Sequence, residues 1–307
     1  MSGKSFVPDR TLRKKYWKGA AKSYLYLLPA LLFLGLFVYW PLVQVTILSF
    51  FRWNLVSPNR TFVGLDNFAS LLTGPKFFGI LLQTLLYIFI ALLGNFLLPV
   101  GLAMLTLQVG RRYTDLYQSL LFTPTVVAVS VGALLWQWIY LPTGGLLNTL
   151  LSVFGLPEVN WLNDPDTALG AVGVVAAWQF MGFNYLISLA GLKAVPREYL
   201  EAARIDGATG WPLLRWVIIP LLMPTLLFVA LTSILQALPN AFVPIEILTR
   251  GGPSESSDNL LYTIYQDGFQ FFQVGKASAE AVVTILLLGG AAIWQFRILD
   301  RSLNYER

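Results

Sequence analysis

The chain has 307 residues, a net charge of +5 and a mean hydropathy of +0.64; 56% of its residues are hydrophobic and only 12% are charged. Soluble domains carry about 25% charged residues, so this composition excludes an ordinary water-soluble domain. The absence of Cys and His excludes disulfides, thiol and imidazole chemistry, and most transition-metal sites. We therefore expect an all-α, polytopic membrane protein.

Six windows of the sequence lack any Asp, Glu, Lys or Arg. They cover residues 23–51, 77–110, 116–157, 167–192, 216–245 and 281–296. A spanning helix needs about 20 mostly apolar residues. The first five windows are long enough, and the sixth becomes so if it starts near Ala277 and includes Glu280. We therefore predict six transmembrane helices, near residues 25–50, 80–107, 116–140, 167–192, 213–238 and 277–298.

Prolines interrupt four of these predicted helices, and each removes one backbone hydrogen bond. They are Pro41, Pro99, Pro124, Pro220 and Pro224. Neighbouring helices can satisfy the freed backbone groups inside a membrane, so we interpret these prolines as ordinary kinks.

The distribution of Lys and Arg predicts the orientation of the spans. With a cytoplasmic amino terminus, 16 of the 21 basic residues lie on the cytoplasmic side. The positive-inside rule therefore favours both termini in the cytoplasm. These basic residues are spread over four segments that flank the membrane, so they do not indicate nucleic-acid binding.

Three segments on the predicted outer side carry local structure. Residues 61–72 predict a short surface helix that Asp66 or Asn67 caps. Residues 141–166 are rich in turn formers, and residues 262–274 predict a partly apolar surface helix.

The cytoplasmic segment 193–215 is the most highly charged interior loop, with four cations and three anions. Its residues predict a helix, a tight turn and a second helix. Glu198 and Glu201 lie near the start of the first helix, where negative charge stabilises the helix dipole. Gly207 suits the left-handed end of that helix, and Thr209 can cap the next one. Taken alone, this pattern also fits a plain loop that its own ion pairs stabilise.

The loop resembles the Glu-Ala-Ala...Gly signature of bacterial ABC importer permeases, with Glu201, Ala202, Ala203 and Gly207 at the central positions. Residues 62–68 (Phe-Val-Gly-Leu-Asp-Asn-Phe) and 248–253 (Leu-Thr-Arg-Gly-Gly-Pro) are similar to the carbohydrate branch, the maltose and glycerol-phosphate type. The resemblance implies a type I importer permease fold. It divides the chain into a cytoplasmic tail (1–22), a first helix with an outer loop (23–76), a permease core with the loop at 193–215 (77–298) and a second cytoplasmic tail (299–307).

This resemblance implies that the chain is the permease subunit of an ATP-driven, binding-protein-dependent importer of a sugar, a polyol or glycerol phosphate. The implied partners are a homologous second permease, two ATPase subunits that bind ATP and Mg, and an extracytoplasmic solute-binding protein; no cofactor is expected on this chain. The implied ATPase-coupling residues are Glu198, Glu201, Ala202, Ala203, Asp206 and Gly207.

A polar route for the cargo is indicated in the fourth and fifth spans. The candidate residues are Trp178, Gln179, Gln236 and Asn240. Uncharged amides and an indole suit a neutral, hydroxylated cargo, but helix–helix hydrogen bonds explain Trp178 and Asn240 equally well. We favour such bonds for Asn95 and Asn184, and an outer headgroup position for Glu280.

Two other classes of protein remain as alternatives. An ion-coupled secondary transporter places ionisable groups or broken helices at the middle of the membrane, and five of the six predicted spans contain no Asp, Glu, Lys or Arg. A membrane enzyme is weaker still, since the spans contain no paired carboxylates for acid–base chemistry.

Overall fold

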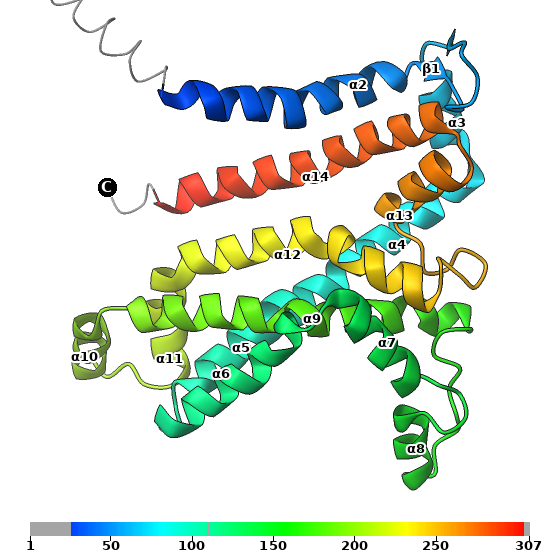
Figure 1. Ribbon diagram of the computed structural model, residues 1–307. Helices are drawn as coiled ribbons and strands as arrows, with labels where there is room; N and C mark the ends of the chain where they lie inside the picture. The colour runs from blue at the N-terminus through cyan, green and yellow to red at the C-terminus, as the bar shows by residue number, and fades with distance from the viewer. Residues whose placement is uncertain (1–25, 110, 304–307) are drawn as a thin grey trace, which may run out of the picture.

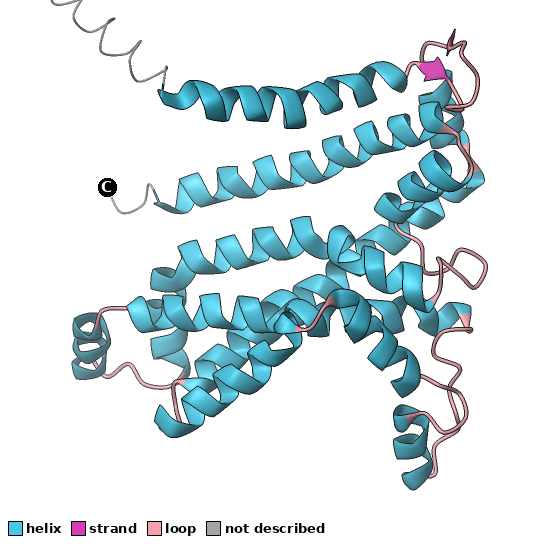
Figure 2. Ribbon diagram, viewed as in Figure 1, coloured by secondary structure: helices cyan, strands magenta, loops and turns pink. Residues whose placement is uncertain are grey.

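The computed structural model describes residues 26–109 and 111–303, and within them the fold is almost entirely helical (Figures 1 and 2). The predicted tail at 1–22 lies outside the described residues. Five helices are long and apolar enough to cross a membrane, and a pair of helices bent by 100° supplies a sixth span. The all-α, six-span fold class is thus confirmed. The five are Tyr26–Leu48, Pro75–Thr106, Pro165–Ala194, Trp211–Leu248 and Val274–Arg297.

Short helices and one small hairpin connect the spans. The elements are, in chain order, η1 (Gly35–Tyr39), α2 (Trp40–Leu48), β1 (Phe51–Arg52), β2 (Thr61–Phe62), α3 (Asp66–Thr73), α4 (Pro75–Leu92), η2 (Leu93–Leu97), α5 (Leu98–Thr106), α6 (Arg111–Val126), α7 (Val129–Ile139), α8 (Leu146–Val153), α9 (Pro165–Ala194), α10 (Arg197–Ile205), α11 (Trp211–Leu213), η3 (Leu214–Ile218), α12 (Ile219–Leu248), α13 (Leu260–Tyr265), η4 (Gln266–Gln270) and α14 (Val274–Leu303).

The two ends of the bundle differ in what they carry. The start of the first described helix, the end of α14 and helix α10 lie together at one end (Figure 1). The hairpin of β1 and β2, with α3 and α8, lies at the other end. The hairpin is antiparallel and pairs Phe51 with Phe62 and Arg52 with Thr61. The charged segment and the helix ends near both termini therefore share one side of the bundle.

Three spans contain a π-helical segment that ends two residues before a proline. The segments η1, η2 and η3 precede Pro41, Pro99 and Pro220. Proline cannot donate to the preceding turn, and its ring clashes with the carbonyl group four residues earlier. One wider turn relieves that clash while the helix continues. These three prolines therefore act locally and leave their spans unbroken.

Pro124 has a larger effect than the predicted kink. Helix α6 ends at Val126, and α7 begins at Val129 after a bend of 100°. The two residues between them are Val127 and Ala128. The third span is therefore a broken helix, and the prediction of one kinked helix over residues 116–140 is wrong.

Helix α9 forms the centre of the fold because small residues let its neighbours approach closely. A Cβ atom added at Gly182 would lie 2.1 Å from the carbonyl oxygen of Leu121 in α6. A Cβ atom at Gly94 would lie 2.5 Å from Ala177. Such close approach is typical of helix contacts in membranes. Around α9 the buried core includes Tyr87, Tyr140, Val172, Val175, Ile245 and Tyr262.

The segments predicted to lie on the outer side differ from their predicted local structure. Helix α3 starts at Asp66 without a side-chain cap, so neither predicted residue caps it. Asn67 is buried instead and donates to the carbonyl oxygens of Ser49 (2.8 Å) and Phe51 (3.0 Å). This amide holds the end of the first span that lies beside the hairpin. The described helix of that span has no buried residue in its most apolar window.

The two remaining outer segments also differ from their predictions. The turn-rich loop at 141–166 contains a helix, α8. The predicted surface helix at 262–274 is shorter and begins earlier, at Leu260, because the Asn259 side chain accepts from the Tyr262 amide.

Candidate coupling helix and cargo route

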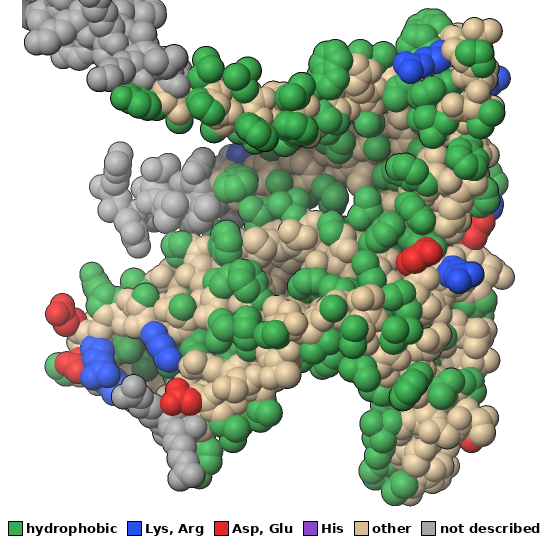
Figure 3. Space-filling view, viewed as in Figure 1, with side chains coloured by type: hydrophobic (Ala, Val, Ile, Leu, Met, Phe, Trp, Pro, Cys, Tyr) green, Lys and Arg blue, Asp and Glu red, His purple; other side chains and the backbone are tan. Residues whose placement is uncertain are grey.

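Helix α10 is an exposed, charged helix at the end of the bundle where Lys, Arg, Asp and Glu side chains gather (Figure 3). None of its residues is buried. Its apolar side chains are also open, since Ile205 is 87% exposed and Tyr199 is 56% exposed.

The end of α10 has the geometry that its glycine predicts. Asp206 follows the last helical residue, and Gly207 has a φ of +85°. The amide of Ala208 donates to the carbonyl oxygen of Ala203 (2.8 Å), which closes the last turn of the helix. An L side chain at Gly207 would meet no neighbour within 4 Å, but it would strain the backbone.

The second helix of this segment continues directly into the fifth span. Helix α11, η3 and α12 form one helical stretch from Trp211 to Leu248. Its N-cap is Gly210, with a φ of +59° and no side-chain hydrogen bond, so the predicted cap by Thr209 is wrong. Helix α10 is therefore joined through one short turn to a helix long enough to span a membrane.

The predicted coupling residues form one accessible group. Among them, Ala203 is half-buried, and Glu198, Glu201, Ala202, Asp206 and Gly207 are exposed. Within the described part of the chain, the ion pairs are Lys76–Glu255, Lys276–Asp267 and Lys276–Glu280, and none involves the segment 193–215. The alternative of a loop that its own ion pairs stabilise therefore lacks support.

Gln179, a predicted route residue, holds the broken third span together. Its side chain is buried, and its Nε2 atom donates to the carbonyl oxygens of Pro124 and Val127, both at 2.6 Å. The Thr125 hydroxyl donates back to the Gln179 carbonyl oxygen at 3.1 Å. These bonds give hydrogen-bond partners to carbonyl groups at the carboxyl end of α6 and at the bend, where the helical ladder stops.

The other predicted route residues lie in different surroundings. Trp178 lines a mostly apolar pocket of about 480 Å³ between α7, the turn at Gly144 and α9. Asn240 lines a narrow cavity of about 10 Å³ with Asn95 and Tyr87. Gln236 is exposed. The structure therefore does not bring these four residues together in one cavity.

Asn184 and Asn95 make the helix–helix contacts that the sequence favoured. The Asn184 Nδ2 atom donates to the Asn95 carbonyl oxygen (2.6 Å) and to the Ser233 hydroxyl (3.3 Å). The Ser233 hydroxyl also donates to the Asn95 carbonyl oxygen (3.0 Å). The bonds join the second, fourth and fifth spans beside the π-helical segment η2.

A family described as "binding-protein-dependent transport system inner membrane component" matches residues 77–305, more than half of the chain. The chain belongs to this family. A probable ABC transporter permease of Pyrococcus horikoshii is 36% identical over 267 residues, covering 86% of this chain and 90% of the relative. The sn-glycerol-3-phosphate transport system permease UgpA of Brucella abortus is 32% identical over 288 residues, covering 92% and 96%.

A solved structure shares the fold. A bacterial ABC transporter involved in import of the acidic polysaccharide alginate has a chain that aligns with a TM-score of 0.80 and 23% identity, covering 94% of this permease and 99% of that chain. The family, the relatives and the apolar helices make this chain a multi-pass permease of the bacterial plasma membrane.

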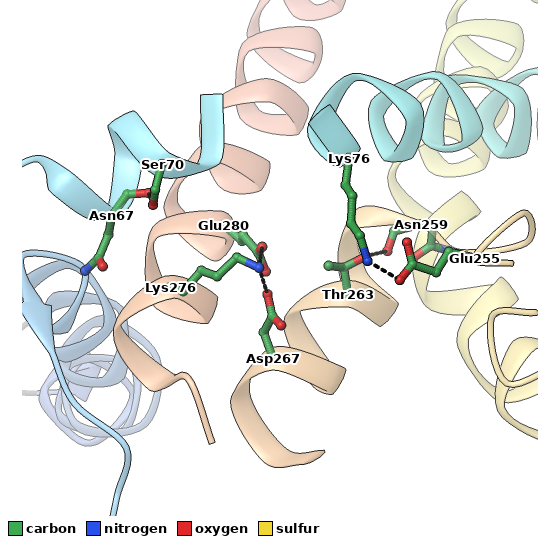
Figure 4. Close-up of polar contacts among 9 residues, drawn as sticks. All are labelled: Asn67, Ser70, Lys76, Glu255, Asn259, Thr263, Asp267, Lys276 and Glu280. Carbon is green, nitrogen blue, oxygen red and sulfur yellow. Dashed lines mark hydrogen bonds and ion pairs between the residues drawn. The ribbon is translucent and has the colours of Figure 1, made fainter. Parts of the chain in front are cut away.

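The permease also carries a polar cluster at the end of the bundle opposite α10, which the sequence did not predict (Figure 4). Lys276 lies between two buried carboxylates, with its Nζ 2.7 Å from Asp267 Oδ2 and 3.8 Å from Glu280 Oε1. Glu280 is 2% exposed, so protein covers its side chain, while its predicted place at the outer headgroup level stays a prediction. An exposed ion pair, Lys76 with Glu255, lies beside this cluster.

Asp258, in the loop before α13, is a third buried acidic residue in this region, in addition to Asp267 and Glu280. It is 2% exposed. Burial, then repulsion from Glu255, raises the pKa of Asp258 to about 7. The sequence shows a group of charged residues at 255–280, but its local pattern does not show that Asp258, Asp267 and Glu280 are buried.

Proposed function

We propose that this permease belongs to an ATP-driven importer and that α10 is the element that couples it to two separate ATPase subunits. The observation that carries the proposal is that α10 is exposed, charged and without internal ion pairs, yet is joined through one turn to the fifth span. A partner that moves α10 therefore moves a membrane helix. Glu198, Glu201, Ala202, Ala203, Asp206 and Gly207 form the proposed contact.

ATP and Mg belong to the ATPase subunits in this proposal, and a homologous second permease completes the passage through the membrane. An extracytoplasmic solute-binding protein delivers the cargo. Both termini lie in the cytoplasm with α10. This orientation is supported by the 16 of 21 basic residues that fall on that side and by the shared end of the bundle (Figure 1).

We propose a sugar or a glycerol phosphate as the cargo. The UgpA relatives are named for sn-glycerol 3-phosphate, and the transporter that shares the fold is involved in the import of alginate. Trp178 offers an aromatic face in its 480 Å³ pocket, and Asn240 offers an amide. Gln236 remains a candidate for contact with the cargo because its side chain is exposed. Gln179 contributes indirectly, because its side chain holds the backbone beside Trp178.

Matched glycine variants test the coupling role of α10. Gly207 and Gly155 both have a positive φ (+85° and +69°), and neither has a neighbour within 4 Å of an added Cβ atom. Gly207→Val and Gly155→Val therefore impose similar strain, about 1–3 kcal/mol, but Gly155 follows α8 in the outer loop. Glu158→Lys is likewise the matched control for Glu201→Lys, because it reverses the charge of an exposed residue in the predicted outer loop.

Each variant is expressed with its partner subunits, and both the retained ATPase and the ATP-dependent uptake into vesicles are measured. Binding of sn-glycerol 3-phosphate, maltose and alginate oligosaccharides to the solute-binding protein identifies the cargo by thermal shift. We expect the two α10 variants to lose ATPase subunits or coupled uptake, and the two outer variants to keep both. Uptake driven by an ion gradient without ATP would instead establish a secondary transporter.

A further inference from the structure

A cavity of about 520 Å³ lies between the hairpin of β1 and β2, helix α3 and the segment that leads into α14. These elements lie together at the end of the bundle opposite α10 (Figure 1). Two of the described residues that line the cavity are basic, most of the others are neutral and polar, and none is acidic. The cavity therefore suits an anion better than a cation.

Arg52 supplies the available positive charge of this cavity. Its side chain is exposed and forms no ion pair within the described part of the chain. The other basic lining residue, Lys276, is already paired with Asp267 and Glu280. The N–H donors of a guanidinium group lie in one plane and match the oxygens of a phosphate group. Arg52 is therefore free to bind one.

The walls of the cavity are held in place by the protein itself. Trp53 Nε1 donates to the Ser57 carbonyl oxygen (2.8 Å), and the Ser57 amide donates to Asn54 Oδ1 (2.8 Å). On the opposite wall, a Cβ atom at Gly275 would lie 1.9 Å from the carbonyl oxygen of Phe51, so the start of α14 packs directly against β1. Binding in this cavity therefore needs little rearrangement of the chain.

Neutral donors line the same cavity as Arg52. Among the described residues, the side-chain amide nitrogens of Asn54, Asn59 and Gln273 donate no hydrogen bond to a protein group. Each of these nitrogens carries two hydrogens that can be donated to an anion. The cavity thus combines one unpaired cation with several donors that the protein does not use.

The cavity lies at the level where the chain enters the membrane. Arg52 directly follows the uncharged window at residues 23–51. Lys276 lies in the first turn of the last span, Val274–Arg297. Charged residues that flank two apolar spans at the same end of a bundle lie among the lipid headgroups.

Exposed apolar side chains stand around the polar cavity. Val56 is 78% exposed, Phe62 is 68% exposed and Phe271 is 58% exposed. The ring of Trp53, an aromatic residue typical of the membrane interface, forms part of the wall. A ligand with acyl chains covers such side chains, whereas a free phosphate ion does not. The surroundings therefore favour a lipid as the source of the anion.

We propose that this cavity binds the phosphate headgroup of an anionic phospholipid, with Arg52 as its cationic contact. The amides of Asn54, Asn59 and Gln273 donate to the headgroup oxygens, and the acyl chains lie over the apolar side chains beside the cavity. The bound lipid joins the hairpin to the start of α14. It therefore adds to the contact by which Asn67 holds the first span.

Replacement of Arg52 tests the headgroup contact. Arg52→Gln removes the charge, and Arg250→Gln is the matched control, because Arg250 is exposed in the loop after α12 and does not line this cavity. The complex with its partner subunits is stripped of lipid, and binding of added phosphatidylglycerol is followed by native mass spectrometry. We expect Arg52→Gln to raise the Kd of the first phosphatidylglycerol about tenfold, as loss of one charge-assisted hydrogen bond implies. Arg250→Gln should leave this Kd unchanged, and equal Kd values in all three complexes would overturn the proposal.

Two parallel measurements distinguish the lipid from other anionic ligands. Inorganic phosphate at the same concentration should not displace phosphatidylglycerol, because it lacks acyl chains; displacement would show a site for free anions and refute the lipid. Binding of the solute-binding protein to the same variants is also measured. If Arg52→Gln weakens that binding and leaves phosphatidylglycerol binding unchanged, the cavity receives an acidic side chain of the protein and the proposal is wrong.

Photolabelling tests the site without any substitution. The complex is placed in nanodiscs that contain phosphatidylglycerol with a diazirine in its headgroup, and the labelled peptides are identified by mass spectrometry. We expect the highest adduct yield in residues 52–61 and 271–276. The loop at 141–166, at the same end of the bundle, is the control. Equal yields in the control loop and in the two cavity segments would contradict a specific site.

Discussion

Replacement of Gln179 by Leu tests whether this amide holds the broken third span. The change keeps most of the side-chain volume and removes two donors, each 2.6 Å from a backbone carbonyl oxygen. Side-chain hydrogen bonds between membrane helices average about 0.6 kcal/mol and reach about 1.7 kcal/mol. Two such bonds predict a loss of about 1–3 kcal/mol in the free energy of unfolding.

Gln295→Leu is the matched control. The Gln295 side chain is also buried, but its Nε2 atom makes one hydrogen bond, to the Leu227 carbonyl oxygen at 2.8 Å. We expect this variant to lose about half as much stability. Unfolding in mixed micelles is followed by tryptophan fluorescence, because Trp178 lies beside the break. If Gln179→Leu destabilises the permease no more than the control does, the amide does not hold the break.

Three further predictions concern packing and charge. Gly182→Ala should destabilise the permease by about 1–3 kcal/mol, because its Cβ atom would lie 2.1 Å from a carbonyl oxygen, whereas Gly170→Ala meets nothing within 4 Å and should be neutral. Lys276→Met should cost about 3–5 kcal/mol since it leaves buried carboxylates unpaired, and Lys76→Met, in an exposed pair, should cost less than about 1 kcal/mol. Because the folded pKa of Asp258 is about 7 against an ordinary 3.8, the folded state holds a proton that the unfolded state releases. Stability should therefore fall as the pH rises from about 4 to 7. Asp258→Asn should remove this dependence in unfolding measurements across that range; an unchanged pH profile would show that another group titrates.

The sequence predicted the spans because hydrophobic windows between charges are a local signal. The helix of α10 and the left-handed Gly207 were predictable for the same reason, since dipole charges and a terminal glycine act within one turn. The prolines were identified, but their effects were not. Pro220 leaves its helix continuous through a wider turn, while Pro124 is followed by a 100° bend.

The difference between these two prolines depends on what lies beside each helix. At the bend, the Gln179 side chain from another span donates to the carbonyl oxygen of Pro124, which lies 55 residues away in the sequence. Asn67 was assigned to a helix cap, but it reaches the carbonyl oxygen of Ser49 across the outer hairpin. For Glu280 the sequence showed an isolated acid, but not its burial beside Lys276 and Asp267. Local patterns cannot predict such tertiary partners.

Cross-linking from Ile205 tests the central claim most directly. Its side chain is 87% exposed at the end of α10, and the chain has no Cys to compete. Ile205→Cys is placed in the assembled complex, and a short bismaleimide is added with single thiols on the ATPase surface. Phe154→Cys, 78% exposed beside α8, is the control. The coupling role of α10 predicts a permease–ATPase adduct from residue 205 whose yield changes with ATP, and none from residue 154. Absence of any adduct from residue 205 in a complex that still transports with ATP would contradict it.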